Sequence, residues 1–361
     1  MLLKQLNKSW QLGRDSTRRK LGVLLFDSKV AYVSYPTVDL QHVVFIRWDA
    51  KWGDAIVSSL MIEPLRRACP DIKITIVTKA DLAGYFEDDL EADQVLEVPD
   101  KRTYKQLNAL AQQLGAVDLL VHFNMHFKMK DLYLLYKVQA KRVAGLDDDI
   151  GQVNLKLGKV TQGLHFSQKF VYLLQSLGIK VENPQYHVPL NSEAVLKVEE
   201  FLASKDNFPL LVINSYGGDK ARRLNIANTK KIISTVLGIQ PAINIAVLFT
   251  PDTESEVQQL CDDMDSDNVF YYPESRTIYD ATALVAKADW VISVDTAIVH
   301  IASGLNKPLL ALYNPDELNY SDWHPNSDKA ITCFSEQVSP PDINALDWQK
   351  LLPSLSTLLK S

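Results

Sequence analysis

Short apolar runs alternate with longer amphipathic stretches from residue 41 almost to the end of the chain, and this alternation limits the fold more than any other feature. The runs HVVFIRW, IKITIVT and VDLLVHF have the length and the content of β-branched residues that are typical of buried strands. The stretches between the runs, such as residues 54–68, repeat apolar residues near helical spacing. Because strands that alternate with helices form parallel sheets covered on both faces, we predict an α/β fold of doubly wound sheets.

The alternation is interrupted once and then begins again. Polar sequence rich in Asp and Gly occupies residues 147–163, and two prolines, Pro184 and Pro189, break the stretch 178–191. A second series of strands and helices follows, and a length of 361 residues suits two domains. We therefore predict two Rossmann-like domains facing a cleft. The predicted parts are a basic extension (1–40), an N-terminal domain (41–185), a C-terminal domain (186–335) and a terminal helix (336–361) that packs back on the N-terminal domain.

Charge is distributed unevenly along the chain. The first 30 residues carry seven Lys or Arg and two Asp, a charge of +5, and the net charge of −6 for the whole chain leaves −11 for the rest. An acidic body argues against general binding of nucleic acid. The basic head has two interpretations, contact of residues 1–30 with an anionic membrane surface or a solvated helix that packs on its own domain.

Other features of the composition indicate the compartment. The apolar runs are far shorter than the roughly 18 residues that span a bilayer, and the first residues do not form a secretory signal. Cys69, Cys261 and Cys333 are far apart and lack the spacing of metal ligands, which fits free thiols in a reducing cytosol. We expect a cytoplasmic protein whose contact with a membrane, through residues 1–30, is peripheral.

The stretch VISVDTAIVHIASGLNKPLLALYNP carries the most informative pattern. A buried strand ends at Asp295, and a short helix starts at Thr296. The start of a helix offers unpaired N–H groups and a partial positive charge, which together seat a phosphate or diphosphate. Asp295 is at the predicted N-cap position and His300 about one turn inside, so both are candidates to hold the hydroxyls of a bound sugar. The alternative is a plain helix cap and a core histidine.

Two further stretches follow strands. In LLVINSYGGDKARRLN, paired glycines precede the cations Lys220, Arg222 and Arg223, which suits an anion site or, alternatively, a turn with solvated charges. In WDAKWGD, Gly53 and Asp54 open a helix whose dipole favours an ionised carboxylate. Asp54 is therefore a candidate proton acceptor, with helix capping as the alternative.

Metal chemistry finds little support in the sequence. The runs DSD (265–267) and DDD (147–149) lie in polar stretches outside strand ends, and HFNMH (122–126) offers two histidines without a third ligand nearby. We expect no metal and no cofactor.

Taken together, these stretches resemble glycosyltransferase family 9, the bacterial lipopolysaccharide heptosyltransferases. Arg47, Gly53 and Asp54 match the family's opening motif, and residues 295–315 match its C-terminal motif. The resemblance implies a GT-B fold and an inverting, metal-independent transfer of heptose from ADP-heptose to a lipid A–Kdo core acceptor. The implied partners are thus a nucleotide sugar and an anionic glycolipid.

The resemblance also implies roles for individual residues. Asp54 matches the general base of the family. The implied donor-binding residues are Arg222, Glu254, Asp295, Thr296, Ala297 and His300. Candidates for the acceptor are the cations Arg47, Lys51, Lys128 and Lys130.

Three departures from the family pattern keep alternatives open. Ala297 replaces the glycine of the C-terminal motif, Leu224 replaces an aromatic residue, and HFNM replaces a DLQG-like stretch. The alternatives are a family member with another nucleotide-sugar donor, or a non-catalytic relative that binds a nucleotide sugar. A nucleotide-sugar epimerase of the same fold needs further acid and base residues, and we identify no convincing set.

Overall fold

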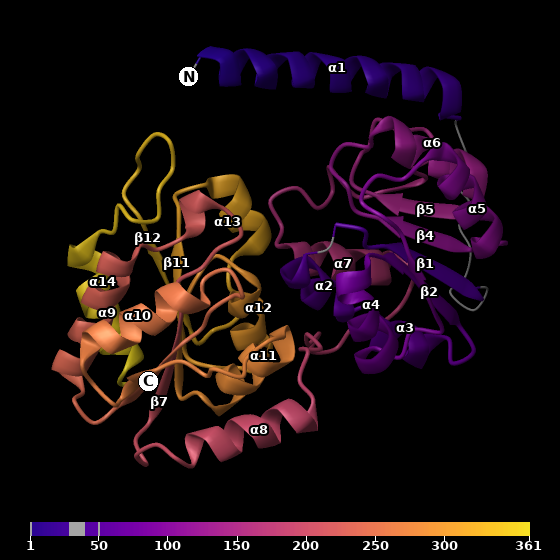
Figure 1. Ribbon diagram of the computed structural model, residues 1–361. Coiled ribbons are helices and arrows are strands. Elements are labelled where there is room, and N and C mark those ends of the chain that lie inside the picture. Colours follow the sequence, from indigo (N-terminus) through magenta and orange to yellow (C-terminus); the bar gives the residue numbers. More distant parts are fainter. Residues whose placement is uncertain (1, 29–39, 50) are drawn as a thin grey trace. The chain divides into compact units, whose positions relative to one another are not determined.

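The computed structural model describes residues 2–28, 40–49 and 51–361, with side chains from Arg14 onward. The chain divides into two compact units (Figure 1). The first consists of Met1–Ala50 and Ser59–Pro184, and the second of Lys51–Ser58 and Gln185–Ser361. The boundary after Pro184 lies within the segment expected to link two domains. The excursion Lys51–Ser58 belongs to the second unit and carries Asp54 into it.

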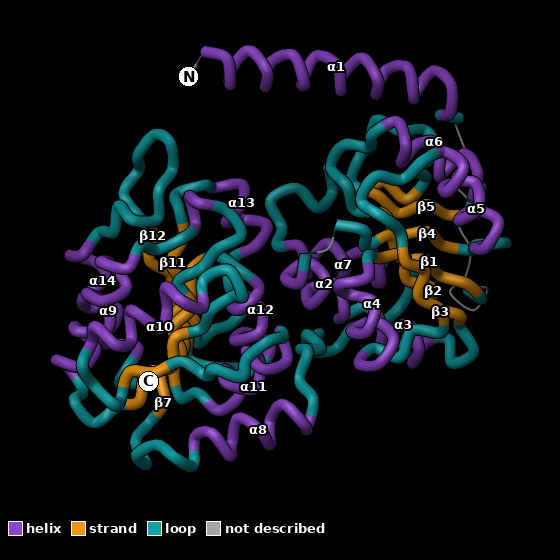
Figure 2. Tube along the Cα trace, in the orientation of Figure 1, coloured by secondary structure: helices purple, strands orange, loops and turns teal. Residues whose placement is uncertain are grey.

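The first unit is built on a parallel sheet with helices on both sides (Figure 2). Within the described residues the sheet has six strands in the order β3-β2-β1-β4-β5-β6. The strands are β1 (His42–Ile46), β2 (Lys73–Thr78), β3 (Gln94–Glu97), β4 (Leu119–His122), β5 (Arg142–Gly145) and β6 (Leu155–Lys156). The helices are α1 (Leu2–Phe26), α3 (Ile62–Ala68), α4 (Ala80–Gly84), a π-helical turn (Tyr85–Asp89), α5 (Tyr104–Leu114), α6 (Met129–Val138) and α7 (Phe166–Ser176).

Local sequence explains these elements. Every residue of β1 is buried, as expected for a central parallel strand covered on both faces. Thr103 and Gln106 form a capping box that begins α5, and Gly115, with φ of +64°, ends it. The core beneath α5 and α6 contains Val44 and Leu120 from adjacent strands.

The basic head folds as α1, whose C-terminal part packs on α6 of the same unit (Figure 1). Arg19 Nη2 donates to Asp147 Oδ1 at 2.9 Å, and the Asp27 carboxylate accepts from the backbone of Gly151 and Gln152. Other cations of the head, namely the side chains of Lys4 and Lys8 and the whole of Lys29, lie outside the described part. In the residues that the structure describes, no helix combines the length and apolar composition needed to cross a bilayer.

The second unit repeats the same plan with a second parallel sheet. Its described residues form six strands in the order β12-β11-β10-β7-β8-β9. They are β7 (Leu210–Asn214), β8 (Asn244–Val247), β9 (Val269–Phe270), β10 (Trp290–Val294), β11 (Leu309–Tyr313) and β12 (Ala330–Phe334). The helices are α2 (Trp52–Ser59), α8 (Ser192–Leu202), a 3₁₀ turn (Lys220–Arg222), α9 (Ile226–Ile239), α10 (Glu254–Met264), α11 (Ile278–Lys287), α12 (Ala297–Gly304), α13 (Glu317–Trp323) and α14 (Trp348–Leu358).

The terminal helix α14 belongs to the second unit. Its leucines Leu351, Leu355 and Leu358 are buried in the core of that unit, and α14 packs on α9, β11 and β12. This placement replaces the predicted packing of the helix on the N-terminal domain, because the apolar stripe of α14 finds its partners next to the strand that precedes it.

In both sheets the strand order reverses beside the first strand of the unit. The reversal lies between β1 and β4 in the first unit and between β7 and β10 in the second. Sheets of this kind bind ligands at the carboxyl ends of the strands that flank the reversal. Since β7 and β10 pair in parallel, with Asn214 opposite Ser293, the loops that follow them leave the sheet side by side.

Candidate functional site

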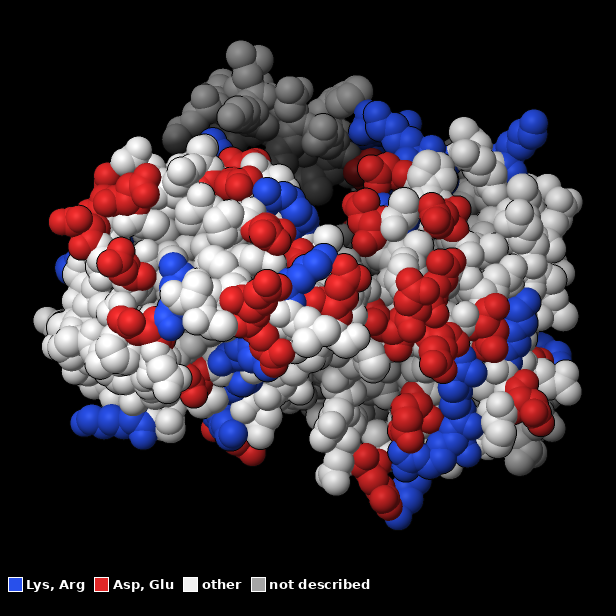
Figure 3. All heavy atoms as spheres, turned by 60° about the horizontal axis from the view of Figure 1, so that its bottom comes forward, with Lys and Arg blue, Asp and Glu red and all other residues white. Residues whose placement is uncertain are grey.

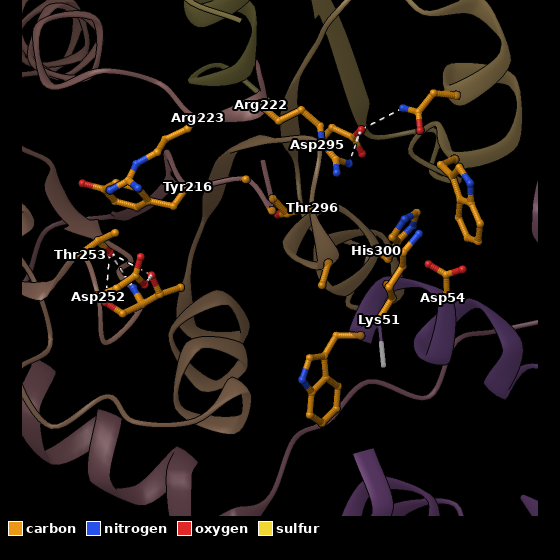
Figure 4. Close-up of a pocket in the computed structure, with 18 residues that line it drawn as sticks. Lys51, Asp54, Tyr216, Arg222, Arg223, Asp252, Thr253, Asp295, Thr296 and His300 are labelled. Carbon is orange, nitrogen blue, oxygen red and sulfur yellow. Dashed lines mark hydrogen bonds and ion pairs between the residues drawn. The ribbon is translucent and has the colours of Figure 1, made fainter. Parts of the chain in front are cut away.

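A pocket of about 560 Å³ lies in the second unit at the carboxyl ends of β7 and β10 (Figure 4). Five segments of that unit supply its lining: Lys51–Asp54; Tyr216–Gly218 with Arg222 and Arg223; Thr250, Asp252 and Thr253; Asp295–Ala297 with His300; and Asn319 with Trp323. The volume falls in the usual range for sites that bind small molecules or cofactors.

The start of α12 forms the middle of the pocket wall. Thr296 is the N-cap, since its side-chain oxygen accepts a hydrogen bond from Ile298 N at 3.2 Å. Asn214 Nδ2 donates to the same Thr296 oxygen at 2.9 Å and thereby ties the cap to the end of β7. The prediction that Asp295 caps this helix is therefore wrong by one residue. The extended backbone of Thr296 directs its own hydroxyl toward the helix start.

Asp295 instead holds the cation of the β7 loop. Its Oδ2 accepts from Arg222 Nη1 at 3.1 Å and from Asn319 Nδ2 at 2.9 Å, and its side chain is buried. Arg222 Nε also donates to Asp219 Oδ2 at 3.0 Å. Burial alone lowers the pKa of Arg222, but the carboxylates of Asp295 and Asp219 outweigh this effect and raise it. The guanidinium therefore stays charged and is held in one orientation beside the start of α12.

One end of the pocket combines an aromatic ring with a second arginine (Figure 4). The Arg223 guanidinium lies 4.8 Å from the centre of the Tyr216 ring and donates from Nη2 to Glu256 Oε2 at 2.9 Å. Burial, with the nearby Glu256 carboxylate, raises the pKa of Tyr216 to about 12, so this hydroxyl keeps its proton. On the same side, the hydrogen bond from Thr250 Oγ1 lowers the pKa of Asp252.

His300 lies at the other end, one turn into α12 (Figure 4). The side chain is buried among the rings of Tyr186 and Trp323. Burial, and to a smaller extent the charge of His324, lowers the pKa of His300 to about 4. The imidazole is therefore neutral near pH 7 and can donate one hydrogen bond and accept another.

Asp54 and Lys51 lie at this same end, contributed by α2 and the residue before it (Figure 4). Asp54 is in the first turn of α2, where the helix dipole favours a carboxylate. A Cβ atom on Gly53 would lie 3.0 Å from His300 Cδ2 and 3.7 Å from Ala297 Cα. Glycine at this position thus lets α2 approach α12 closely, which brings Asp54 to the pocket.

The structure therefore brings together most of the predicted donor residues. Arg222, Asp295, Thr296, Ala297 and His300 line one pocket with Asp54. Glu254 does not line it. Glu254 is the first residue of α10, and its Oε1 lies 3.8 Å from Arg276 Nη1. Asp252 and Thr253, which precede it, line the pocket instead.

Of the four acceptor candidates, Lys51 alone lines this pocket, since the other three belong to the first unit. Arg47 is buried and its Nη2 lies 3.2 Å from Asp49 Oδ2. Lys128 is the exposed residue at the N-cap position of α6, and Lys130, also exposed, donates to the backbone oxygen of Arg102.

Several lining residues were not among the candidates predicted from the sequence. Asn319 and Trp323 come from α13, a short helix for which we recognised no motif in the sequence. Tyr216 and Asp252 follow strand ends, so their position after a buried run was the one available clue. Among residues that the structure describes, no group of three or more His, Cys, Asp or Glu is placed to hold a metal ion.

The chain matches the model of a known protein family. The family model described as "Glycosyltransferase family 9 (heptosyltransferase)" matches residues 107–350. A protein of Escherichia coli strain K12, described as a candidate lipopolysaccharide heptosyltransferase 4, is 29% identical over 205 residues, which are 54% of this chain. The match covers 53% of that relative, so the chain spans about half the length of the curated relative it matches.

Solved structures share the fold. A glycosyltransferase family 9 protein from Veillonella parvula DSM 2008 superimposes with a TM-score of 0.72 at 19% identity, over 91% of this chain and 100% of the other. The ADP-heptose lps heptosyltransferase II of E. coli gives 0.67 at 15% identity, over 89% and 99%. These likenesses confirm the predicted α/β fold class, GT-B, with one Rossmann-like parallel sheet in each unit.

Proposed function

The chain belongs to glycosyltransferase family 9, and we propose on that premise that it is an inverting, metal-independent glycosyltransferase. The proposed reaction moves a heptosyl group from ADP-heptose to an inner-core acceptor of lipopolysaccharide or lipooligosaccharide. One observation carries the proposal: the start of α12 and Arg222 lie between an aromatic and arginine-lined end and an end that holds Asp54 and His300 (Figure 4). In this order, the aromatic and arginine-lined end would hold the nucleoside, the start of α12 the diphosphate, and the end with Asp54 and His300 the sugar.

The diphosphate would lie against the first turn of α12. The partial positive charge of a helix start and the fixed Arg222 guanidinium both favour an anion there. Lys51 adds a further cation to the lining. In the proposal these groups balance the negative charge that grows on the leaving ADP.

Asp54 would act as the general base. It takes the proton of an acceptor hydroxyl while that oxygen forms a bond to the anomeric carbon. The bond from this carbon to the diphosphate oxygen breaks on the opposite face, and its electron pair leaves with ADP, so the configuration inverts. General base catalysis of this kind contributes about 10²–10⁴-fold. The neutral His300 is suited to orient a sugar hydroxyl.

The name of the E. coli neighbour supports the choice of donor, since it gives ADP-heptose. The acceptor is proposed as an anionic glycolipid of the lipid A–Kdo type, for which the exposed Lys128 and Lys130 are candidate contacts. Such an acceptor places the proposed reaction at the cytoplasmic face of the inner membrane.

The test is calorimetric titration of the full chain with ADP-heptose, ADP, UDP and GDP. The proposal expects ADP-heptose and ADP to bind and UDP and GDP to bind at least tenfold more weakly. Preference for UDP or GDP would refute the donor. Selective binding of ADP-heptose without transfer to any lipid A–Kdo acceptor would favour the non-catalytic alternative.

A further inference from the structure

The C-terminal half of α1 presents two different faces. One face holds the helix on the first unit. A Cβ on Gly22 would lie 3.0 Å from Met129 Cα, and the Phe26 ring meets Tyr133 edge-on at 5.2 Å. Together with the bond between Arg19 and Asp147, these contacts fix the rotation of α1 about its axis. The opposite face is therefore directed away from α6.

That outward face carries arginines and leucines in register. Arg14, Arg18, Leu21 and Leu25 follow at spacings of four, three and four residues, which places them in one row along a helix. Leu24 lies beside the row. We call these five residues the outer stripe of α1. The leucines Leu21, Leu24 and Leu25 are 46%, 80% and 54% exposed, and both arginines are exposed.

Charge indicates what this stripe meets. The chain as a whole is acidic, with a net charge of −6, and the face in Figure 3 shows groups of acidic side chains alongside groups of Lys and Arg. Asp15 Oδ1 lies 3.9 Å from Arg14 Nε, and both side chains are about half exposed, so their attraction is weak. The net negative charge of the rest of the chain thus repels an anionic surface, whereas the arginines of α1 attract it. Exposed leucines in line with arginines fit the interfacial layer of a bilayer, where apolar side chains enter and cations meet headgroups.

We propose that the outer stripe of α1 docks the protein on anionic phospholipid, with Leu21, Leu24 and Leu25 in the interface and Arg14 and Arg18 at the headgroups. The helix lies along the surface and does not cross it. This docking is independent of the proposed transferase activity.

The experiment measures binding of the full chain to sedimented vesicles. Wild type should bind phosphatidylglycerol vesicles, bind phosphatidylcholine vesicles much more weakly, and be released by high salt. The double variant Arg14→Gln/Arg18→Gln should lose about 25-fold, from about fivefold for each cation near an anionic surface. Leu24→Ser/Leu25→Ser should lose about tenfold or more.

Two single substitutions elsewhere on the surface serve as controls. Arg67→Gln removes an exposed arginine from α3, and Leu196→Ser removes a leucine that is 64% exposed on α8. Both should bind vesicles as wild type does. Thermal unfolding of each variant shows whether the fold is intact.

Three results would overturn the docking proposal. One is equal binding to both kinds of vesicle, or no binding to either kind. Another is loss of binding in the controls as large as in the stripe variants. The third is a dimer in sedimentation velocity that Leu24→Ser/Leu25→Ser dissociates, because the stripe would then join two copies of the chain.

Discussion

His300 gives the second unit a dependence on pH whose size follows from its surroundings. The side chain is 4% exposed, and burial, with a smaller contribution from the charge of His324, lowers its pKa to about 4 from an ordinary value of 6.5. Between these two values the unfolded chain binds a proton that the folded chain does not. Stability therefore rises as pH increases from about 4 to about 6.5, and falls as pH drops through the same window.

The size of this effect can be stated. For one site with these two pKa values, the free energy of unfolding decreases by about 2 kcal/mol between about pH 7.5 and about pH 5. Carboxylates elsewhere add their own pH dependence, so the contribution of His300 must be isolated by substitution. His300→Gln keeps a hydrogen-bonding side chain but cannot take up the proton.

The assay is urea unfolding of both proteins at the two pH values, followed by tryptophan fluorescence and far-UV circular dichroism so that separate transitions of the two units are recognised. His300→Gln should lose about 2 kcal/mol less than wild type on acidification. The exposed His187, changed to Gln, is the control and should retain the wild-type dependence. Equal losses in wild type and His300→Gln would refute the reasoning.

Three further substitutions test the pocket wall. Arg222→Gln removes a guanidinium bonded to Asp295, so ADP-heptose affinity should fall about 10–100-fold in calorimetry. An unchanged affinity would contradict the proposed binding of the diphosphate beside Arg222. Thr296→Ala removes the cap of α12 and should cost about 1 kcal/mol in urea unfolding, whereas Thr296→Ser should cost less. Ala297→Gly removes a methyl from the lining at the cost of about 0.5–1 kcal/mol in stability, and donor affinity should rise; weaker binding would show that the methyl is not an obstacle.

The sequence predicted the parallel sheets because the physics involved is local and repetitive. A run such as HVVFI, in which every residue is buried, is typical of a central parallel strand. The amphipathic stretches are typical of helices that cover the two faces of the sheet. The terminal helix was harder. Its apolar stripe indicates that it packs on a core but not on which one, and the structure places Leu351 and Leu355 beside β11 and β12.

In the candidate site, too, the sequence revealed local patterns but not the contacts between distant segments. Asp295 and Thr296 were found because a strand end followed by a helix start is visible in a pattern, but which of them caps α12 depends on backbone angles that adjacent polar residues do not reveal. Gly53 was identified as part of a helix start that follows a strand, while its close approach to His300 is a contact over long sequence distance. Asn319 was missed for that reason too, since its bond to Asp295 joins segments that no local pattern connects.

The central claim is that Asp54 is the base in a transfer from ADP-heptose, and one paired measurement addresses it directly. Single-turnover transfer to a lipid A–Kdo acceptor is compared between wild type and Asp54→Asn, with donor affinity measured on the same preparations. The claim predicts a rate about 10²–10⁴-fold lower in Asp54→Asn with donor affinity within about twofold of wild type. An unchanged rate, or a loss of rate matched by an equal loss of donor affinity, would contradict it.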